Sequence, residues 1–222
     1  MLENIKAVIF DLDGTLVDSM WVWRDIDINY LQDKGSDILI EDLESEIEGM
    51  SFTETAMYFK EKFNIEDSVE DIKEEWNRLA FEYYSKKILL KDGAREFIKY
   101  LKQNDIKLGI GTSNSRELAE AVLLSNGILD YFDTFITSCE AGKGKPNPDV
   151  FLKAAKNLDV KPEECIVFED TYAGVLAGVR AGMKVYGVAD ALSLINKDKI
   201  SKLVEKYIIS YFDLEVLAKE EI

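Results

Sequence analysis

Five short apolar runs separated by amphipathic stretches constrain the fold of this chain more than any other feature. The runs cover residues 7–10, 108–111, 135–137, 166–168 and 185–188, and apolar positions recur at helical spacing over residues 94–103, 116–125, 148–157 and 173–181. Short, continuously apolar runs are typical of strands buried on both faces of a parallel sheet. The alternation therefore predicts an α/β fold, with a doubly wound, mostly parallel sheet and right-handed crossovers.

Residues 18–88 interrupt this alternation. They contain no convincing strand, and their periodicity predicts helices near residues 21–31, 52–63 and 69–84, rich in aromatic side chains and glutamate. The block follows the first predicted strand directly, and the alternation resumes after it. We therefore expect a helical cap domain over residues 18–88, inserted into a core of residues 1–17 and 89–222. The alternative is that these helices pack on the flank of the sheet.

The charge balance limits the partners of the protein. The 222 residues carry 43 acidic and 27 basic side chains, a formal charge of −16, so the long-range field repels nucleic acid and anionic membranes. The sequence has neither a continuous apolar span of about 18 residues nor a signal peptide, so we expect a cytoplasmic protein. It has no histidine, which excludes histidine-based triads, two-histidine metal sites and phosphohistidine chemistry.

Acidic side chains follow two of the predicted strands. Asp11 and Asp13 come after the first apolar run, and their spacing points both side chains the same way at the carboxyl end of the strand, where open α/β sheets bind ligands. Two carboxylates held together repel each other unless a cation lies between them. Glu169 and Asp170 follow the fourth run and fit a hard-cation site, although such a pair can also cap a helix.

The other two strand ends carry groups suited to phosphate. Thr112, Ser113 and Asn114 follow the second run and offer a hydroxyl and backbone N–H groups where a helix begins. The alternative is that Ser115 only caps that helix. Lys145 lies in a loop of glycines and prolines after the third run. Its flexible point charge can pair with a phosphate and a carboxylate together.

These four segments resemble the four motifs of the haloacid dehalogenase superfamily. They are residues 11–19 (DLDGTLVDS), 112–114 (TSN), 144–149 (GKPNPD) and 168–174 (FEDTYAG). The helical insertion after the first motif resembles the cap of the subfamily that contains β-phosphoglucomutase and phosphoglycolate phosphatase. The resemblance implies a Rossmann-like core, Mg²⁺ as cofactor and a small phosphorylated metabolite as substrate. We expect a monomer or a weak homodimer.

The resemblance also implies a role for each motif residue. Asp11 would be the nucleophile that forms an aspartyl-phosphate, and Asp13 would be the general acid and base. Mg²⁺ would be held by Asp11, the backbone carbonyl of Asp13 and Asp170, with Glu169 as an outer or alternative ligand. The phosphate would be bound by four residues: Thr112, Ser113, Asn114 and Lys145.

Two departures from the mutases of this subfamily favour hydrolysis. Those mutases usually carry a histidine where Trp23 falls and an arginine after the Gly-x-Ser turn, where this chain has Phe52. Thr15, at a position where mutases often carry valine, points the same way. We therefore predict a phosphatase, with a mutase of the β-phosphoglucomutase type as the alternative. The cap residues expected to contact the leaving group are Trp21, Trp23, Arg24, Met50 and Phe52.

Two readings without catalysis are weaker. A receiver domain also places paired acids, a hydroxyl and a lysine at strand ends, but receivers are about half this length and lack the cap. An inactive interaction protein on the same fold is the second, and the intact motif residues argue against it.

Overall fold

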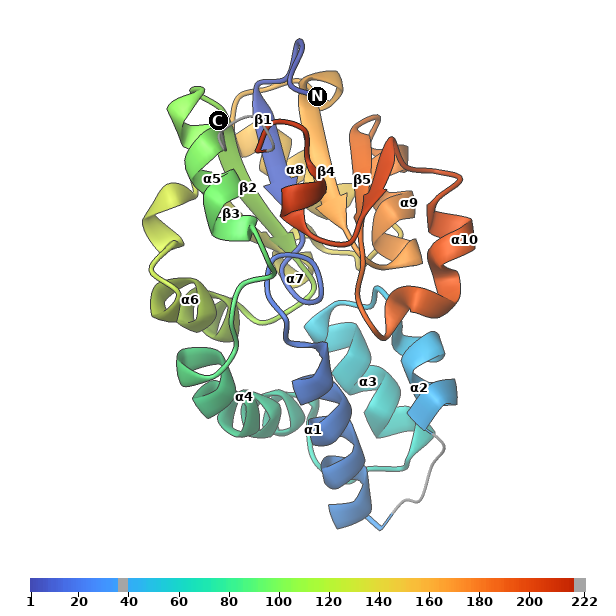
Figure 1. Ribbon diagram of the computed structural model, residues 1–222. Helices are drawn as coiled ribbons and strands as arrows, with labels where there is room; N and C mark the ends of the chain where they lie inside the picture. The colour runs from blue at the N-terminus through green and yellow to red at the C-terminus, as the bar shows by residue number, and fades with distance from the viewer. Residues whose placement is uncertain (36–39, 218–222) are drawn as a thin grey trace.

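The computed structural model describes residues 1–35 and 40–217, and a six-stranded sheet forms its centre (Figure 1). Every neighbouring pair of strands is parallel, in the order β3-β2-β1-β4-β5-β6. The doubly wound α/β fold predicted from the apolar runs is therefore confirmed. The strands are β1 (Ala7–Phe10), β2 (Lys107–Thr112), β3 (Thr134–Thr137), β4 (Cys165–Glu169), β5 (Lys184–Val188) and β6 (Lys206–Ile208).

The edge strand β6 was not expected from the sequence. It has three residues, of which only Ile208 is buried, so it contains no apolar run that could predict it. Its partner β5 supplies the pairing, with Val188 opposite Ile208.

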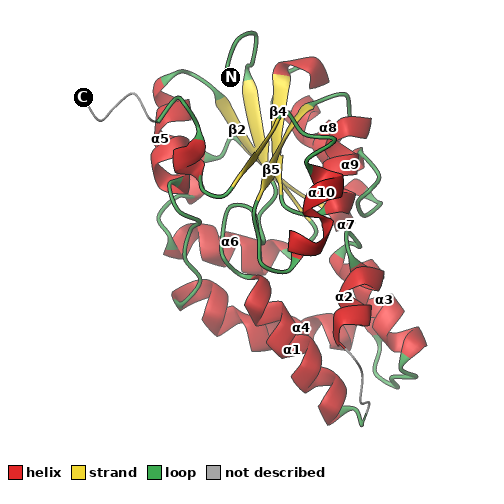
Figure 2. Ribbon diagram, turned by 45° about the vertical axis from the view of Figure 1, so that its right-hand side comes forward, coloured by secondary structure: helices red, strands yellow, loops and turns green. Residues whose placement is uncertain are grey.

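Helices cover both faces of the sheet (Figure 2). On β1, Val8 and Phe10 belong to the apolar cluster shared with α5 (Ala94–Gln103) and α6 (Arg116–Ser125). Ala7 and Ile9 belong to the cluster shared with α8 (Asp149–Asn157) and α9 (Tyr172–Arg180). The alternation of side chains along a strand thus separates two cores, one on each face. Two shorter helices are α7 (Ser138–Ala141) and α10 (Lys197–Ile200).

Four further helices lie beyond the carboxyl ends of the strands, where the strand arrows point in Figure 1. They are α1 (Met20–Asp33), α2 (Ile40–Ile47), α3 (Phe52–Lys62) and α4 (Val69–Lys86). Of these four helices, α2, at 8 residues, was not predicted from the sequence. Trp76 on α4 joins α1 and α3 to it, because the centre of its ring lies 4.9 Å from that of Phe59, 5.7 Å from that of Phe52 and 5.8 Å from that of Tyr30.

This group of four helices spans the carboxyl edge of the sheet, not its flank (Figures 1 and 2). Helix α4 also packs along α6 of the core. Across the described residues, no helix has the length and apolar character needed to cross a membrane.

Candidate active site

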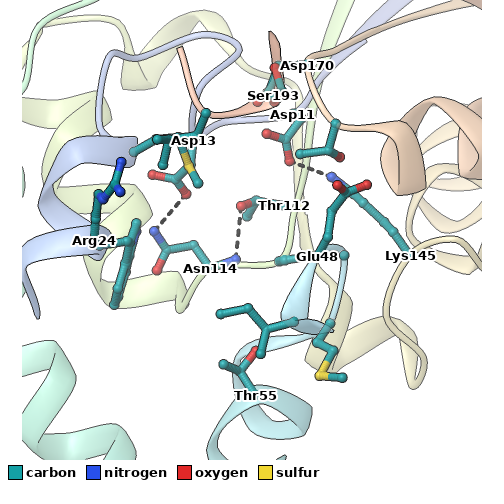
Figure 3. Close-up of a pocket in the computed structure, with 18 of the residues that line it drawn as sticks. Asp11, Asp13, Arg24, Glu48, Thr55, Thr112, Asn114, Lys145, Asp170 and Ser193 are labelled. Atoms are coloured by element: carbon teal, nitrogen blue, oxygen red, sulfur yellow. Dashed lines mark hydrogen bonds and ion pairs between the residues drawn. The ribbon is translucent and has the colours of Figure 1, made fainter. Parts of the chain in front are cut away.

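A cavity of about 450 Å³ lies between the carboxyl ends of the strands and the four inserted helices. Figure 3 shows side chains from both sides converging on it, with Asp11, Asp13 and Asp170 on the side of the sheet. Thr112, Ser113, Asn114, Lys145 and Glu169 also line it. The structure thus brings together the residues that follow four separate strands, because parallel strands end at the same edge.

Three buried carboxylates and one buried ammonium form the centre of the cavity. Oxygen atoms of Asp11, Glu169 and Asp170 all lie within 4.8 Å of one another. The Nζ atom of Lys145 lies 2.5 Å from Oδ1 of Asp11 and 2.5 Å from Oε1 of Glu169. One cation therefore faces two carboxylates directly, and the third carboxylate lies beside them.

The pKa values reflect this crowding. Burial raises the pKa of Asp11 well above its usual range, the charge of Lys145 opposes that effect, and the charge of Glu169 adds to it. Burial, Glu169 and Asp11 likewise raise the pKa of Asp170. Burial alone would lower the pKa of Lys145, but Asp11 and Glu169 outweigh it and raise that pKa. The cluster is short of positive charge, and hard carboxylate oxygens fit a divalent cation such as Mg²⁺.

The turn after Asp13 shapes the position of Asp170. Gly14 has a φ of +77°, and a Cβ atom there would lie 2.5 Å from Oδ2 of Asp170. The hydroxyl of Thr15 donates a hydrogen bond of 2.8 Å to Oδ1 of Asp170. The Gly-Thr pair of the first motif thus leaves room for the carboxylate of Asp170 and orients it.

Glu169 is held by contacts within the protein. Its Oε1 accepts from Lys145, and its Oε2 accepts from the backbone N–H and the hydroxyl of Thr171, each at 3.1 Å. A Cβ atom at Gly174 would lie 1.8 Å from Oε1, so glycine is required where α9 passes the carboxylate. Both oxygens of Glu169 are engaged, whereas Oδ2 of Asp170 faces Gly14 across the turn.

Three donors converge on the carboxylate of Asp13. Oδ1 accepts from the hydroxyl of Ser19 at 2.6 Å and from the hydroxyl of Tyr84, and Oδ2 accepts from Nδ2 of Asn114 at 2.8 Å. Burial raises the pKa of Asp13, and these three donors oppose the rise. Burial and the charge of Asp13 raise the pKa of Tyr84, which keeps its phenol protonated at neutral pH.

Asn114 differs from the expectation that it binds phosphate. Its Nδ2 donates to Asp13, and its Oδ1 accepts from the backbone N–H of Ser115 at 2.7 Å. Both ends of the amide are therefore engaged, and Asn114 orients Asp13 in this structure. The reason is tertiary, because the sequence does not show that the loop after β2 turns toward the first motif.

Thr112 and Ser113 lie at the end of β2. The Oγ1 of Thr112 accepts from the backbone N–H of Asn114 at 3.0 Å, which leaves the hydroxyl hydrogen to point elsewhere. The backbone oxygen of Ser113 accepts from the N–H of Phe52 at 2.9 Å, so the start of α3 is joined to this loop. Ser115 also caps α6, since its hydroxyl accepts from the N–H of Leu118.

Four of the five inserted residues expected to contact the leaving group line the cavity: Trp23, Arg24, Met50 and Phe52. Trp21 does not. Its side chain is 44% exposed, its ring packs against Tyr83, and its Nε1 donates to the backbone oxygen of Asp18. Trp21 points away from the cavity because residues two apart in a helix point about 200° apart around its axis.

Sequence reasoning missed several residues that line this cavity or, like Tyr84, contact a lining residue. Tyr84 was one aromatic residue among many in a helical stretch, and no local signal marks it. Glu48 precedes the Gly49 turn, and its carboxylate accepts from the N–H of Ala173 at 2.8 Å and from Nδ2 of Asn196 at 3.2 Å. Other lining residues outside the predicted set include Asp27, Thr55, Trp76 and Ser193.

Comparison with known protein families identifies the chain. The model of the haloacid dehalogenase-like hydrolases matches residues 5–182. The chain belongs to this family. The resemblance read from the four motifs is therefore confirmed, and the receiver-domain alternative is excluded.

Individual relatives include phosphatases and a mutase. The chain is 31% identical over 190 residues to a phosphorylated carbohydrates phosphatase of Thermotoga maritima, covering 85% of this chain and 88% of the relative. It is 30% identical over 210 residues to β-phosphoglucomutase of Bacillus subtilis, covering 88% of each. The crystal structure of a β-phosphoglucomutase from Clostridium difficile superposes with a TM-score of 0.80 at 27% identity, over 95% of this chain and 93% of the other.

Proposed function

We propose that this hydrolase is a Mg²⁺-dependent phosphatase that hydrolyses a small phosphomonoester, a sugar phosphate or a similar metabolite, through an aspartyl-phosphate intermediate. One observation carries the proposal: Asp11, Glu169 and Asp170 converge within 4.8 Å at the sheet edge, and Lys145 bridges two of them. A phosphoryl group placed there meets a carboxylate nucleophile and a buried cation together.

Phosphoryl binding falls to the groups at the end of β2 and to Lys145. The free hydroxyl hydrogen of Thr112 and the backbone N–H of Ser113 donate to phosphoryl oxygens. Lys145, whose side chain is almost fully buried, offsets their negative charge. Phosphoryl transfer depends mainly on positioning and charge stabilisation, and these groups supply both.

The reaction proceeds in two steps. A carboxylate oxygen of Asp11 attacks phosphorus, the bond between phosphorus and the ester oxygen breaks, and Asp13 gives its proton to the departing alkoxide. Asp13 then takes a proton from water as the water attacks phosphorus of the aspartyl-phosphate. The products are the alcohol and inorganic phosphate, and Asp11 returns to its starting state.

The residues present fit the metal that this chemistry uses. Mg²⁺ would be held by Asp11, the backbone carbonyl of Asp13 and Asp170, with Glu169 as an outer ligand because both of its oxygens are engaged. When bound, Mg²⁺ neutralises charge on the phosphoryl oxygens. It also relieves the repulsion among the three buried carboxylates.

The inserted helices act as the cap in this proposal, with residues 18–88 as the cap and residues 1–17 and 89–222 as the core. Three backbone groups of the core hold the turn before α3. The oxygen of Ser113 accepts from Phe52, and the N–H groups of Gly144 and Ala173 donate to Glu54 and Glu48. These contacts hold the cap over the reacting centre, and a cap in that position shields the reaction from water.

The cap favours hydrolysis over mutase chemistry. A mutase must bind the phosphate that its substrate keeps, and two cap positions that could do so carry aromatic rings. Trp23 directs its N–H to the hydroxyl of Tyr84 at 2.6 Å, and Phe52 is buried against Trp76. Glu48, an acid, lies beside the same turn, and burial raises its pKa. Trp23 and Phe52 therefore supply no positive charge for a second phosphate, and Arg24, which also lines the cavity, is assigned to the leaving group.

The direct test is phosphate release. The purified protein should release phosphate from a panel of small phosphomonoesters with Mg²⁺ and lose that activity in chelator. Asp11→Asn should lose turnover by several orders of magnitude. Asp13→Asn, supplied with p-nitrophenyl phosphate, whose leaving group departs without a proton, should accumulate phosphorylated protein that decays slowly. Wild-type rates in Asp11→Asn would refute the nucleophile.

The mutase alternative has its own assay. NMR can follow the conversion of a hexose 1-phosphate to the 6-phosphate in the presence of a trace of the hexose bisphosphate. This isomerisation should be negligible compared with hydrolysis. Faster isomerisation than phosphate release would reverse the assignment made from Trp23 and Phe52.

A further inference from the structure

We propose that Tyr84 of the cap is a positioning residue that holds Asp13, the general acid and base, in its working orientation. This inference rests on the proposed phosphatase function and adds a residue to it. Tyr84 is 71 residues from Asp13 in sequence, and its hydroxyl donates to Oδ1 of that carboxylate. It lies on α4, whereas Asp13 follows β1.

The direction of the hydrogen bonds is determined by the partners of the phenol. The Nε1 of Trp23 can only donate, and it lies 2.6 Å from the Tyr84 hydroxyl. The Nδ2 of Asn114 donates to the same oxygen at 3.0 Å, because Oδ1 of that amide is occupied by the N–H of Ser115. Tyr84 therefore receives two hydrogen bonds, and its single hydrogen goes to Asp13.

The network fixes both oxygens of Asp13. Tyr84 and Ser19 reach Oδ1, and Asn114 uses its second amide hydrogen on Oδ2. Asn114 thus contacts Tyr84 and Asp13 together, which closes a ring of three side chains. A carboxylate tied at both oxygens by buried donors has little freedom to rotate.

The helix that carries Tyr84 is itself anchored to the core. The Oγ of Ser125, on α6, donates to the backbone oxygen of Tyr84 at 3.1 Å. About two turns earlier on α4, Oδ1 of Asn77 accepts from the hydroxyl of Ser115 at 2.6 Å. Tyr84 is fully buried where α4 lies on α6. The phenol is therefore held by a rigid helix, and a small displacement of α4 would shift the carboxylate of Asp13.

A positioning role through proton transfer predicts a loss that depends on the leaving group. Alkoxides are poor leaving groups and need the proton of Asp13, whereas p-nitrophenolate leaves without it. The ratio kcat/KM reports the steps up to phosphoenzyme formation and so isolates the first transfer. Removing the phenol hydroxyl should therefore harm alkyl phosphates far more than p-nitrophenyl phosphate.

The variant is Tyr84→Phe, and the matched control is Tyr83→Phe, one residue earlier on α4, whose ring packs on Trp21 outside the cavity. With Mg²⁺, we expect kcat/KM of Tyr84→Phe to fall about 10–100-fold for glycerol phosphate, part of the factor that general acid catalysis supplies. For p-nitrophenyl phosphate we expect a fall below about 3-fold. Tyr83→Phe should match the wild type with both substrates.

A double variant tests whether Tyr84 acts through Asp13. In the background of Asp13→Asn, the further change Tyr84→Phe should reduce kcat/KM for glycerol phosphate less than 2-fold, since residues that act as a unit are not additive. Equal losses with both substrates, no loss, or full additivity in the double variant would each overturn the proposal. A wild-type protein that hydrolyses no phosphomonoester would instead refute the proposed function.

Discussion

Replacing Lys145 by methionine tests the electrostatic account of the site. The change keeps an apolar stem and removes a positive charge that faces Asp11 and Glu169 at 2.5 Å each. Lys145 is only 6% exposed, so solvent screens its charge poorly. Removing one partner of a buried ion pair costs about 3–5 kcal/mol, because the other charge is left uncompensated.

This cost can be converted into a melting temperature. In a protein of this length, a change of 1 kcal/mol shifts Tm by about 2–4 °C. Lys145→Met should therefore lower Tm by about 6–20 °C in the absence of metal. The loss should be smaller at pH 5 than at pH 8.

The sign of the pH dependence follows from Asp11. Lys145 lowers the pKa of Asp11, which burial has raised above its unfolded value, so removing Lys145 raises it further. A carboxyl with a raised folded pKa favours the fold below its unfolded pKa of about 3.9, and that contribution is lost as the pH rises through the folded pKa.

Thermal unfolding followed by circular dichroism in chelator measures the effect. The matched control is Lys143→Met, two residues earlier in the same loop, where the lysine is exposed. The control should melt within about 1–2 °C of the wild type, since surface substitutions change stability by about 0.5 kcal/mol or less. If Lys145→Met melts like the control at pH 8, the carboxylates of Asp11 and Glu169 are not stabilised by this cation and the reasoning fails.

Three further predictions concern the same site. Mg²⁺ at about 100 times its Kd should stabilise the wild type by about 2.7 kcal/mol, which raises Tm in a melting assay with Mg²⁺ compared with chelator. Asp170→Asn should remove most of that rise in Tm. An undiminished rise would place the metal elsewhere. Gly14→Ala puts a Cβ atom 2.5 Å from Oδ2 of Asp170 at a φ of +77°. Urea unfolding should therefore show that the free energy of unfolding falls by about 1–2 kcal/mol or more. Isothermal titration calorimetry should show a weaker affinity for Mg²⁺. Glu54→Ala removes the acceptor for the N–H groups of Ser51 at 2.7 Å and Gly144 at 3.1 Å; we expect about 1 kcal/mol of lost stability and a higher KM, and an unchanged KM would show that the cap closes without this contact.

Much of the fold and the centre of the site could be predicted from the sequence because their signals are local. An apolar run predicts a buried strand, and polar residues directly after it must lie at the sheet edge. In a parallel sheet all such ends meet, so Asp11, Thr112, Lys145 and Asp170 could be brought together without knowing the strand order. Strand β6 was not predicted because its pairing with β5, not its own sequence, places it in the sheet.

The cap residues could not be assigned in the same way. Trp21 and Trp23 look alike in sequence, and only the orientation of α1 puts Trp23 in the cavity and Trp21 on the surface. Asn114 lies beside residues expected to bind phosphate, yet its amide is directed to Asp13. Tyr84 carries no local signal and reaches the site because α4 packs on α6.

The sequence by itself therefore determined which chemistry gathers at the sheet edge, because strand ends and turns are set by neighbouring residues. Only the tertiary structure determined how the side chains of the site are oriented. Asp13 receives its hydrogen bonds from residues 6, 71 and 101 positions away. Which donor reaches which oxygen depends on how the cap lies on the core, and a contact between distant segments leaves no pattern in either one.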